Sequence, residues 1–359
     1  MAIEEIAIDH FRNLLHLRFS PCPFINLIVG KNGSGKTSIL EAIYYLGTAK
    51  SFRTPHVNFL ITTGAEKFTL FSRVRKGDIT LSVGIKRDKK QLKIKVANHV
   101  VNNASQLAEL LPIQLINPDV HKMMEEGPRY RRRFIEWGVF HVKPSYLGLW
   151  RQCLHILKQR NAALRQTLSS KELDYWDDAL CDVADRINQL RLDYIKNLQP
   201  YIHQLLSSVP DVPQITVALE QGWSVTEPLL QILKASRATD LKKGFTQHGP
   251  HRADLSIQVG NINLKDLVSR GQQKLIAALL KIAQLKYLLD TGPSNNPILL
   301  VDDLPAELDA EFRKVLVTEI AALPIQSFIT CTDQSALQFE ETDNQRRVFH
   351  VKQGHIEPL

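Results

Sequence analysis

The feature that most constrains the fold of this 359-residue chain is the wide separation, in sequence, of two motifs of phosphate chemistry. Near the N-terminus, Gly30 to Thr37 (GKNGSGKT) match the phosphate-binding loop pattern G-x-x-x-x-G-K-[ST]. Near the other end, the apolar run 298–301 leads directly into Asp302 and Asp303. A simple one-domain nucleotide-binding fold would bring the loop and the carboxylates much closer in sequence. The spacing therefore predicts a head built from two halves of the chain, with another domain inserted between them.

The glycine loop has the surroundings in which this pattern binds phosphate. It follows a predicted strand, 24–29, and precedes a predicted helix that starts at about Lys36. Glycines let the backbone curl so that its N–H groups face a β-phosphate at the positive end of the helix. The alternative is a chance glycine turn in front of a helix. We expect ATP to be contacted by the whole loop, that is by Gly30, Lys31, Asn32, Gly33, Ser34, Gly35, Lys36 and Thr37.

Two loop residues and the two carboxylates are expected to carry the chemistry. Lys36 should reach the β- and γ-phosphates, while Thr37 and Asp302 should bind Mg²⁺. Asp303 would then lie beside the γ-phosphate and orient or activate the attacking water, so we expect Lys36 and Asp303 to be catalytic. A surface turn residue is the alternative for Asp303. Two adjacent carboxylates repel each other unless a cation lies between them, which favours the site.

A third motif lies between the other two. Residues 269–272 (SRGQ) open a predicted helix and resemble the S-G-G-Q signature of ABC-type ATPases. In that superfamily the signature meets the nucleotide of the other subunit, so that two ATP molecules join two heads. Residues 306–309 (AELD) resemble the S-A-L-D loop of the same class. The resemblance implies further ATP contacts from Ser269, Gly271, Gln272 and Asp309.

The segment between the halves changes to a helical period. Apolar residues follow a 3-4 spacing over 147–168 and again over 173–194, with a short polar break between them. Two such helices should pack antiparallel as a helical arm, with Asn161 at the seam helping to fix the register. The alternative is two amphipathic helices packed on a globular core. We predict an α/β fold, a split ABC/SMC-type ATPase head with a mixed sheet plus an inserted α-helical arm, with head residues 1–115 and 245–359 and arm residues 116–244.

Composition limits the compartment and the class of partner. No apolar run approaches the roughly 18 residues that cross a bilayer, and residues 1–11 alternate like a strand and not like a signal peptide. The four cysteines contain no C-x-x-C pair, so neither zinc nor a disulfide framework is expected, and a reduced cytoplasm is the expected location. The net charge of +8 favours a polyanionic partner, although a solvated surface can also carry it.

Two basic clusters are candidate DNA contacts. One crowds a predicted hairpin and contains Lys86, Arg87, Lys89 and Lys90. Its alternative is a solvated sheet edge protected by lysines. The other is predicted on a helix near the arm and contains Arg129, Arg131, Arg132 and Arg133. Salt bridges to Glu125, Glu126 and Glu136 are the alternative there. No base-reading motif is visible, so recognition of DNA shape or junctions without sequence specificity is expected.

Taken together, the motifs identify the chain as similar to the RecF family of bacterial recombination-repair ATPases, which are related to the heads of SMC proteins. The resemblance covers essentially the whole chain. Besides the loop, the signature and the two carboxylates, it rests on Phe11-Arg12-Asn13, Leu40-Glu41-Ala42, Ser51-Phe52-Arg53, Pro118-Asp119, Arg131-Arg132-Arg133-Phe134, Lys158-Gln159-Arg160-Asn161 and Gly249-Pro250-His251-Arg252.

The resemblance implies a function and partners. It implies an ATP-dependent DNA-binding protein that dimerises head to head around two nucleotides on single-stranded, gapped or junction DNA. It also implies that the protein helps RecO and RecR load RecA, supports the SOS response and maintains replication forks. Hydrolysis is expected to be slow and DNA-dependent, a switch more than a metabolic activity.

Departures from the wider ABC pattern leave some roles open. Asp303 stands where a glutamate is usual, and Thr332 stands where transporters have a switch histidine, so the general base is undecided. Gln114 is either a γ-phosphate-sensing glutamine or an ordinary strand residue, and Arg12 either approaches the nucleotide or is an ordinary surface arginine. Three other classes fit less well. A transport subunit would need the switch histidine, and a long SMC organiser would need many more heptads. A small-molecule kinase is disfavoured by the signature at Ser269.

Overall fold

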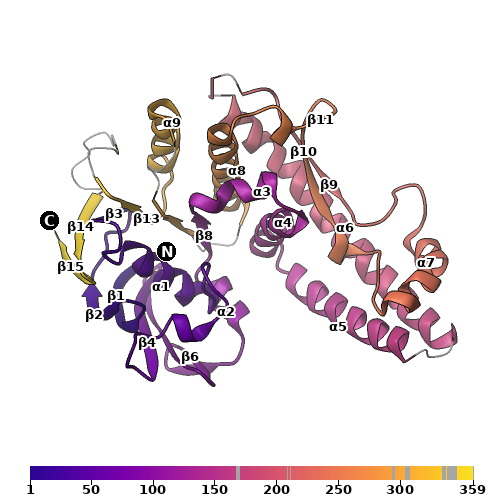
Figure 1. Cartoon of the computed structure of the whole chain (residues 1–359), viewed down its shortest axis with the longest axis horizontal. Helices are drawn as coiled ribbons and strands as arrows, with labels where there is room; N and C mark the ends of the chain where they lie inside the picture. Colours follow the sequence, from indigo (N-terminus) through magenta and orange to yellow (C-terminus); the bar gives the residue numbers. More distant parts are fainter. Residues whose placement is uncertain are drawn as a thin grey trace. The chain divides into compact units, whose positions relative to one another are not determined.

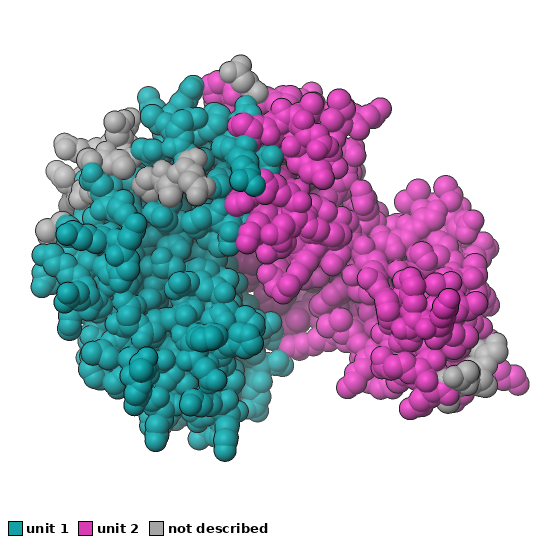
Figure 2. Space-filling model, viewed as in Figure 1, with its two compact units in different colours: residues 1–120, 270–359 teal, residues 121–269 magenta. Residues whose placement is uncertain are grey.

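The structure is a computed structural model of the chain. It describes residues 1–166, 170–207, 209–210, 212–292, 296–303, 308–333, 337 and 346–358. Within that part, the chain divides into two compact units (Figure 2). The head unit comprises residues 1–120 and 270–359, and the arm unit comprises residues 121–269. The predicted split α/β head with an inserted, largely helical domain is therefore confirmed.

The first sheet of the head unit is antiparallel. Among the described residues it has six strands in the order β2-β1-β4-β5-β6-β7. Along these strands apolar side chains alternate with polar ones, so one face is buried and the other meets solvent. The strand predicted from the alternation over residues 1–11 and the hairpin predicted around Lys86 are confirmed. Their bounds are β1 Ala2–Phe11, β2 Leu14–Phe19, β4 Lys67–Lys76, β5 Ile79–Asp88, β6 Leu92–Val96 and β7 His99–Val101 (Figure 1).

The second sheet of the head unit is mostly parallel. Its described strands run β15-β14-β3-β13-β12-β8, and only the edge strand β15 is antiparallel. β12, β13 and β8 are buried at every position, as expected for strands covered on both faces. Their bounds are β3 Ile25–Val29, β8 Ile113–Ile116, β12 Ile298–Val301, β13 Ser327–Cys331, β14 Arg346–Lys352 and β15 His355–Pro358.

Helices complete the head unit. α1 contacts strands of both sheets, which explains why it is buried on almost every side. α8 packs against β8 and α9. Because the strands β14, β3, β13, β12 and β8 are parallel, their carboxyl ends lie at one edge of the sheet, and β3 leads from that edge through the glycine loop into α1. The remaining bounds are α1 Lys36–Thr48, η1 Val57–Phe59, α2 Ala104–Leu110, η2 Pro118–His121, α8 Arg270–Thr291 and α9 Ala310–Ala321.

The arm unit combines helices with a small sheet. Its longest elements, α5 and α6, are antiparallel, because Tyr146 at the start of α5 contacts Arg191 while Arg160 near its end contacts Asp177. The predicted antiparallel pairing is therefore confirmed. Strands β9, β10 and β11 form the sheet. The bounds are α3 Lys122–Glu125, α4 Pro128–Val142, α5 Tyr146–Arg165, α6 Ser170–Leu206, β9 Thr216–Glu220, α7 Leu229–Lys243, η3 Pro250–Arg252, β10 Asp254–Val259, β11 Ile262–Asn263 and η4 Leu264–Asp266.

The predicted seam of α5 is wrong by about one residue. Leu154, expected in the seam, is 49% exposed, whereas the neighbouring Cys153 is buried. The shift arises because α5 packs against α4 and α7 as well as α6, so its buried face is broader than a coiled-coil stripe. Asn161 does not face α6 as a register residue. Its Oδ1 accepts hydrogen bonds from the backbone N–H and the hydroxyl of Thr246, both at 2.8 Å.

The second domain boundary also differs from the expected one. Residues 245–269 were expected in the head but belong to the arm unit. The reason is that β10 pairs with β9 over five registered residues, and α4 packs against β10. The first boundary lies at residues 120/121, five residues after the expected position.

Candidate phosphate-binding site

The glycine loop joins β3 to α1 and has the backbone geometry of an anion cradle. Gly33 and Gly35 have φ angles of 78° and 116°, in the left-handed region that favours glycine. A Cβ atom on Gly30 would lie 2.4 Å from the carbonyl oxygen of Val351, so that position also requires glycine. The first turn of α1 leaves its backbone N–H groups without helical acceptors, at the positive end of the helix dipole. The loop can therefore bind an anion.

Lys36 begins α1 and folds back over this cradle. Its buried Nζ donates to the carbonyl oxygens of Gly30 at 2.6 Å and Lys31 at 3.1 Å. Burial lowers the pKa of Lys36 below its ordinary value, while nearby Asp303 acts in the opposite direction. Within the described part of the chain, the buried Ser34 Oγ has no hydrogen-bond partner. The loop thus holds donors that a phosphate group could accept from, which is the fit expected for a nucleotide.

Thr37 and Asp302 meet although 265 residues separate them. The Thr37 hydroxyl donates to Asp302 Oδ1 at 2.9 Å, and the Thr330 hydroxyl donates to the same oxygen at 2.9 Å. They meet because β3, β13 and β12 are parallel neighbours, so their carboxyl ends share one edge. Burial raises the pKa of Asp302, and the two hydroxyls act in the opposite direction.

This pair fits a divalent metal that is shared with phosphate. Among the residues that the structure describes, no three His, Cys, Asp or Glu side chains gather as a metal cluster. Mg²⁺ is commonly held by one or two protein oxygens together with water and phosphate oxygens, so a full protein cage is not required. Thr37 Oγ1 and Asp302 Oδ1 are hard oxygen ligands at the correct edge of the sheet. They could hold Mg²⁺ once it is shared with a bound phosphate chain.

Asp303 takes a strained backbone conformation. Its φ of 51° lies in the left-handed region, which non-glycine residues rarely adopt. Its backbone N–H donates to the Thr330 hydroxyl at 2.8 Å, which secures the turn after β12. The carboxylate is close enough to raise the pKa of Lys36. Asp303 therefore lies beside the lysine that the loop presents.

The residues of the expected signature and of the AELD segment have different surroundings. Ser269 is the last residue of the arm unit and is exposed, and Gly271 and Gln272 lie in the first turn of α8. Asp309 caps α9: its Oδ1 accepts a hydrogen bond from the backbone N–H of Phe312 at 2.8 Å. Asp309 therefore has a structural role in this protein that the sequence comparison did not indicate. Residues 306–307 lie outside the described residues.

Two arginines lie near the site: the sequence left the role of Arg12 open and did not assign Arg53 to the nucleotide. Glu41 on α1 is fully buried, accepts two hydrogen bonds from Arg12 at 2.8 and 2.9 Å, and lies 3.7 Å from Arg53. The Ser51 hydroxyl also donates to Glu41. Arg12 is thus held in an ion pair. The positive charge of Arg53 acts to lower the pKa of Asp302, which places Arg53 near the carboxylate edge. The sequence signal for these contacts was Glu41, because a carboxylate within the largely apolar α1 needs a cationic partner when it is buried.

Of the two interpretations of Gln114, the structure favours the ordinary strand residue. Gln114 is buried in the middle of β8, and its side-chain amide donates to Gln284 on α8 at 3.0 Å. The polar residue at the end of β8 is Asn117. The backbone N–H of Asp302 donates to the carbonyl oxygen of Ile116 at 2.8 Å, so Asn117 follows at the same edge as Asp302. The sequence could not show this, because the end of a strand depends on its pairing register.

The hairpin cluster places its cations on both faces of the sheet. Lys86 on β5 lies directly opposite Lys93 on β6, and both are exposed. The like charges of Lys67 and Lys93 lower the pKa of Lys86 below its ordinary value. Lys89 and Lys90 form the exposed turn. Arg87 is half-buried on the opposite face from Lys86, because side chains alternate along a strand.

The arginine cluster divides into two internal residues and two exposed ones. Arg131 makes two hydrogen bonds of 2.8 Å to Asp254, which raise its pKa, and also donates to backbone carbonyls. Arg132 donates to the carbonyl oxygen of Ala253 at 3.0 Å. These two side chains hold α4 against β10, so the expectation that they contact DNA is not supported. Arg129 and Arg133 are exposed.

Further observations concern membranes and thiols. In the part of the chain that the structure describes, no helix combines the length and the apolar character needed to span a membrane.

The four cysteines are free thiols. Burial raises the pKa of Cys331, which is near Lys36, to about 11, so this thiol is not a nucleophile at neutral pH.

Comparisons with known proteins bear on the whole chain. A family model described as "RecF/RecN/SMC N terminal domain" matches residues 2–357. The "DNA replication and repair protein RecF" of Pseudomonas syringae pv. syringae (strain B728a) is 40% identical over 360 residues, which cover 99% of this chain and 98% of the relative. The protein of the same description from Pseudomonas fluorescens (strain SBW25) is 41% identical with the same coverage.

Solved structures show the same likeness. One described as "Structure of the recombination mediator protein RecF-ATP in RecFOR pathway" is 26% identical, with a TM-score of 0.86, and the match covers 100% of this chain and 97% of that one. One described as "Crystal structure of the SmcHead bound to the C-winged helix domain of ScpA" is 15% identical, with a TM-score of 0.60 and the same coverage. The second shows a shared fold alone.

Proposed function

The chain belongs to the RecF family within the wider RecF/RecN/SMC group, and from this premise we propose that it is an ATP-dependent DNA-binding protein of replication and recombinational repair. The observation that carries the proposal is the contact between Thr37 and Asp302 beside the glycine loop, at 2.9 Å. This contact joins the N-terminal and C-terminal halves of the head beside the loop that would bind phosphate. A RecF relative of similar structure was solved with ATP, and the curated relatives are described as replication and repair proteins.

Each residue of the site has a separate role toward a bound triphosphate. The loop N–H groups cradle the β-phosphate, and Lys36 exchanges its two loop carbonyls for phosphate oxygens. Thr37 and Asp302 would hold Mg²⁺, which would supply positive charge to neutralise the phosphates. Thr330 orients Asp302 through its hydroxyl. Asp303 positions the attacking water, and its short side chain fits slow turnover.

We further propose that the chain dimerises through its exposed signature. Ser269 is exposed immediately before α8, so a second molecule can reach it. We place Ser269, Gly271 and Gln272 against the γ-phosphate held by a partner copy, where a hydroxyl and a helix N-terminus would meet negative charge. Two ATP molecules would then hold two heads together. Slow, DNA-dependent hydrolysis would act as a switch that releases them.

We propose fewer DNA contacts than the sequence suggested. The exposed hairpin lysines and the two exposed arginines of α4 are free to follow phosphates, whereas the half-buried Arg87 and the internally bonded Arg131 and Arg132 are not. Like charges placed opposite one another on adjacent strands destabilise the free protein, and a polyanion would relieve that repulsion. The remaining candidates are Lys86, Lys89, Lys90, Lys93, Arg129 and Arg133.

The wider role is proposed from the relatives. A RecF relative is described as a recombination mediator in the RecFOR pathway, which suggests RecO and RecR as partners of this chain. With them it would bind gapped or junction DNA, help load RecA onto single strands and support the SOS response. We expect the protein to act on chromosomal DNA in the cytoplasm.

Sedimentation velocity tests the proposal. ATP with Mg²⁺ is expected to convert monomers to dimers, and a gapped duplex is expected to bind more tightly in that state. Ser269→Arg should keep ATP binding but remain monomeric, since the added side chain fills the interface between heads. Ser207→Arg, which changes an exposed serine at the end of α6, is the matched control and should dimerise. Normal dimerisation of Ser269→Arg would contradict the role of the signature.

A further inference from the structure

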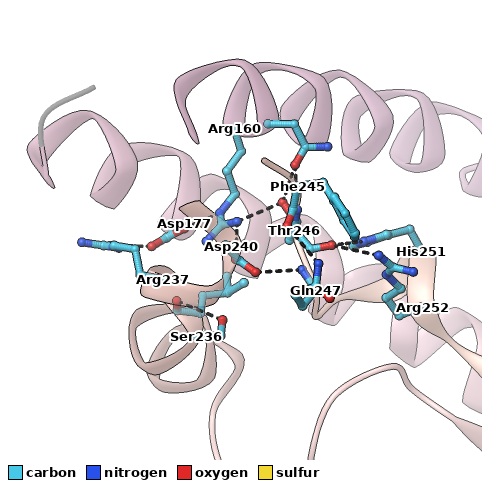
Figure 3. A network of polar contacts seen from close by, with 12 residues as sticks. Arg160, Asp177, Ser236, Arg237, Asp240, Phe245, Thr246, Gln247, His251 and Arg252 are labelled. Carbon is cyan, nitrogen blue, oxygen red and sulfur yellow. Dashed lines mark hydrogen bonds and ion pairs between the residues drawn. The ribbon is translucent and has the colours of Figure 1, made fainter. Parts of the chain in front are cut away.

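The arm unit buries a cluster of charged side chains. Arg160 on α5 is fully buried and donates from Nε to Asp177 on α6 at 2.6 Å and from Nη1 to Asp240 on α7 at 2.8 Å (Figure 3). Arg237 on α7 donates to the second oxygen of Asp177 at 2.6 Å and to Asp174 at 2.8 Å. This network ties three helices together. Buried ion pairs often add little net stability compared with apolar residues of similar volume. We therefore interpret this network as fixing one conformation of the three helices.

The network fixes the segment 244–252, which we term the arm loop. Arg160 Nη1 donates to the hydroxyl of Thr246 at 2.9 Å, and Asp240 accepts from the backbone N–H of Gln247 at 3.1 Å (Figure 3). Farther along, Arg191 donates to the carbonyl oxygen of Pro250 at 2.7 Å. Side chains from three helices therefore hold the backbone of this loop at several points.

A close glycine contact secures the far end of the arm loop. Gly249 has a φ of 133°, which glycine tolerates, and its N–H donates to the carbonyl oxygen of Gly222 at 3.2 Å. A Cβ atom on Gly222 would lie 2.3 Å from the Gly249 carbonyl oxygen, so no larger residue fits there. The arm loop is thus held in place before any ligand arrives.

This fixed loop presents an aromatic ring and an arginine together. Phe245 is 40% exposed, and the guanidinium carbon of the exposed Arg252 lies 5.3 Å from its ring centroid (Figure 3). Arg252 also approaches the carbonyl oxygen of Thr246, at 3.4 Å. The ring therefore keeps part of its surface open to solvent although the loop that carries it is held in place. The arrangement fits a surface prepared for a ligand.

Further cations contact the arm loop or precede it in sequence. Lys243 donates from Nζ to the side chain of Gln247 at 3.0 Å, and Arg165 reaches the carbonyl oxygen of Gly244 at 3.5 Å. Lys242 beside them is exposed. Cations in the last turns of α5 and α7 complement the helix dipoles, which explains their positions but not the exposed ring. The buried carboxylates of Asp177 and Asp240 are paired with Arg160 and Arg237, and not with these exposed cations.

We propose that this surface binds single-stranded nucleic acid, with Phe245 stacked on a base and the cations on phosphates. We term it the arm patch and define it as Phe245, Arg252, Arg165, Lys242 and Lys243. Aromatic rings beside cations are the usual means of binding single strands without sequence preference. A loop held rigid in advance loses little conformational entropy on binding. The inference rests on the proposed DNA-binding function and adds a site on the arm and the form of DNA it takes.

Fluorescence anisotropy of the full chain tests the patch. The probes are a labelled oligothymidylate and an abasic deoxyribose-phosphate strand of the same length, which has the charges but no bases. The unmodified protein should prefer the base-containing strand. Phe245→Ala should weaken binding of that strand by about five- to 150-fold, the range of one base–aromatic stacking contact, and leave binding of the abasic strand unchanged. Arg252→Gln should weaken both and reduce the salt dependence by about 0.7 in slope.

Matched controls separate the patch from general surface effects. Phe59→Ala removes a ring that is 63% exposed in the head unit, and Lys196→Gln removes an exposed cation on α6; both should bind like the unmodified protein. If Phe245→Ala also binds like it, or if the two strands bind equally well, the patch is wrong. ATP-dependent binding of a gapped duplex is measured in parallel. If that binding persists while the patch fails, the proposed function stands, and if no DNA binds in any nucleotide state, the proposed function itself fails.

Discussion

The buried charges of the phosphate site in the head unit and those of the Arg160 network in the arm unit are satisfied in different ways. In the head unit, Lys36 donates to carbonyl oxygens of its own loop, and burial raises the pKa of Asp302. In the arm unit, the guanidinium of Arg160 meets the carboxylates of Asp177 and Asp240 at 2.6 and 2.8 Å. The head charges have partners that a ligand can replace, whereas the arm charges have partners that only unfolding removes.

The comparison separates two uses of a buried charge. An isolated charge in a protein interior is unfavourable unless a counter-charge or a set of hydrogen bonds compensates it. In the arm the chain itself provides the counter-charges, and the result is a fixed loop. At the phosphate site the partners of Lys36 are loop carbonyls that phosphate oxygens can replace, so triphosphate and metal binding can recover free energy there. Each prediction below tests one side of this comparison.

Replacing the central cation of the arm network should have the largest effect. Arg160→Met leaves Asp177 and Asp240 buried without their main counter-charge, and should lower the free energy of unfolding by about 3–5 kcal/mol. Chemical denaturation followed by circular dichroism measures it. Arg165→Met changes an exposed arginine on the same helix and should cost less than about 0.5 kcal/mol. Equal stabilities for the two variants would refute the structural role given to the network.

The corresponding change in the head should affect binding and not stability. Lys36→Met should weaken ATP binding at least about 100-fold, equivalent to about 2.7 kcal/mol, because the cation that faces the phosphates is lost. The unfolding temperature should stay the same or rise, since burial already disfavours the charged lysine. Calorimetric titration and thermal unfolding measure the two effects. Lys50→Met, at the exposed end of α1, should change neither. A large loss of stability in Lys36→Met would mean that Lys36 is structural.

Mild acid should destabilise the arm through two buried histidines. Burial lowers the pKa of His141 to about 3 and that of His251 to about 4. The unfolded chain, with histidine pKa near 6.5, therefore binds protons that the folded arm does not, and stability falls as pH falls below about 6.5. From pH 7 to pH 5 each histidine should account for a loss of about 2 kcal/mol. His141→Asn should reduce the slope of unfolding free energy against pH, and an unchanged slope would contradict a neutral buried His141.

The smallest expected effect concerns the hydroxyl that supports Asp302. Thr330→Val removes a donor to Asp302 and the acceptor of the Asp303 backbone N–H, and should cost about 1–3 kcal/mol in stability. The pKa of Asp302 should rise further, so ATP affinity at limiting Mg²⁺ should fall more at pH 6 than at pH 8. Thr318→Val, on the exposed side of α9, is the control. Identical Mg²⁺ dependence in both variants would show that Thr330 does not orient the metal ligand.

Local patterns were sufficient to predict the elements that carry the loop and the carboxylates. The glycine loop, the start of α1 and the buried run of β12 depend on neighbours in sequence, so their positions were predicted closely. The seam of α5 was misplaced because three partners bury it, and the role of Gln114 stayed open because its surroundings depend on strand pairing. Likewise, nothing adjacent in sequence indicated that Asp254 would bind Arg131.

By itself the sequence determined that this chain has a phosphate cradle, a strand ending in two carboxylates and an inserted helical segment, because each is encoded by residues close together in the chain. Only the tertiary structure decided which distant residues meet. The pairing of β3, β13 and β12 brought Thr37 to Asp302, and the packing of α5, α6 and α7 buried Arg160 among aspartates. Contacts between remote segments depend on how whole surfaces pack, and that information is spread over the entire chain.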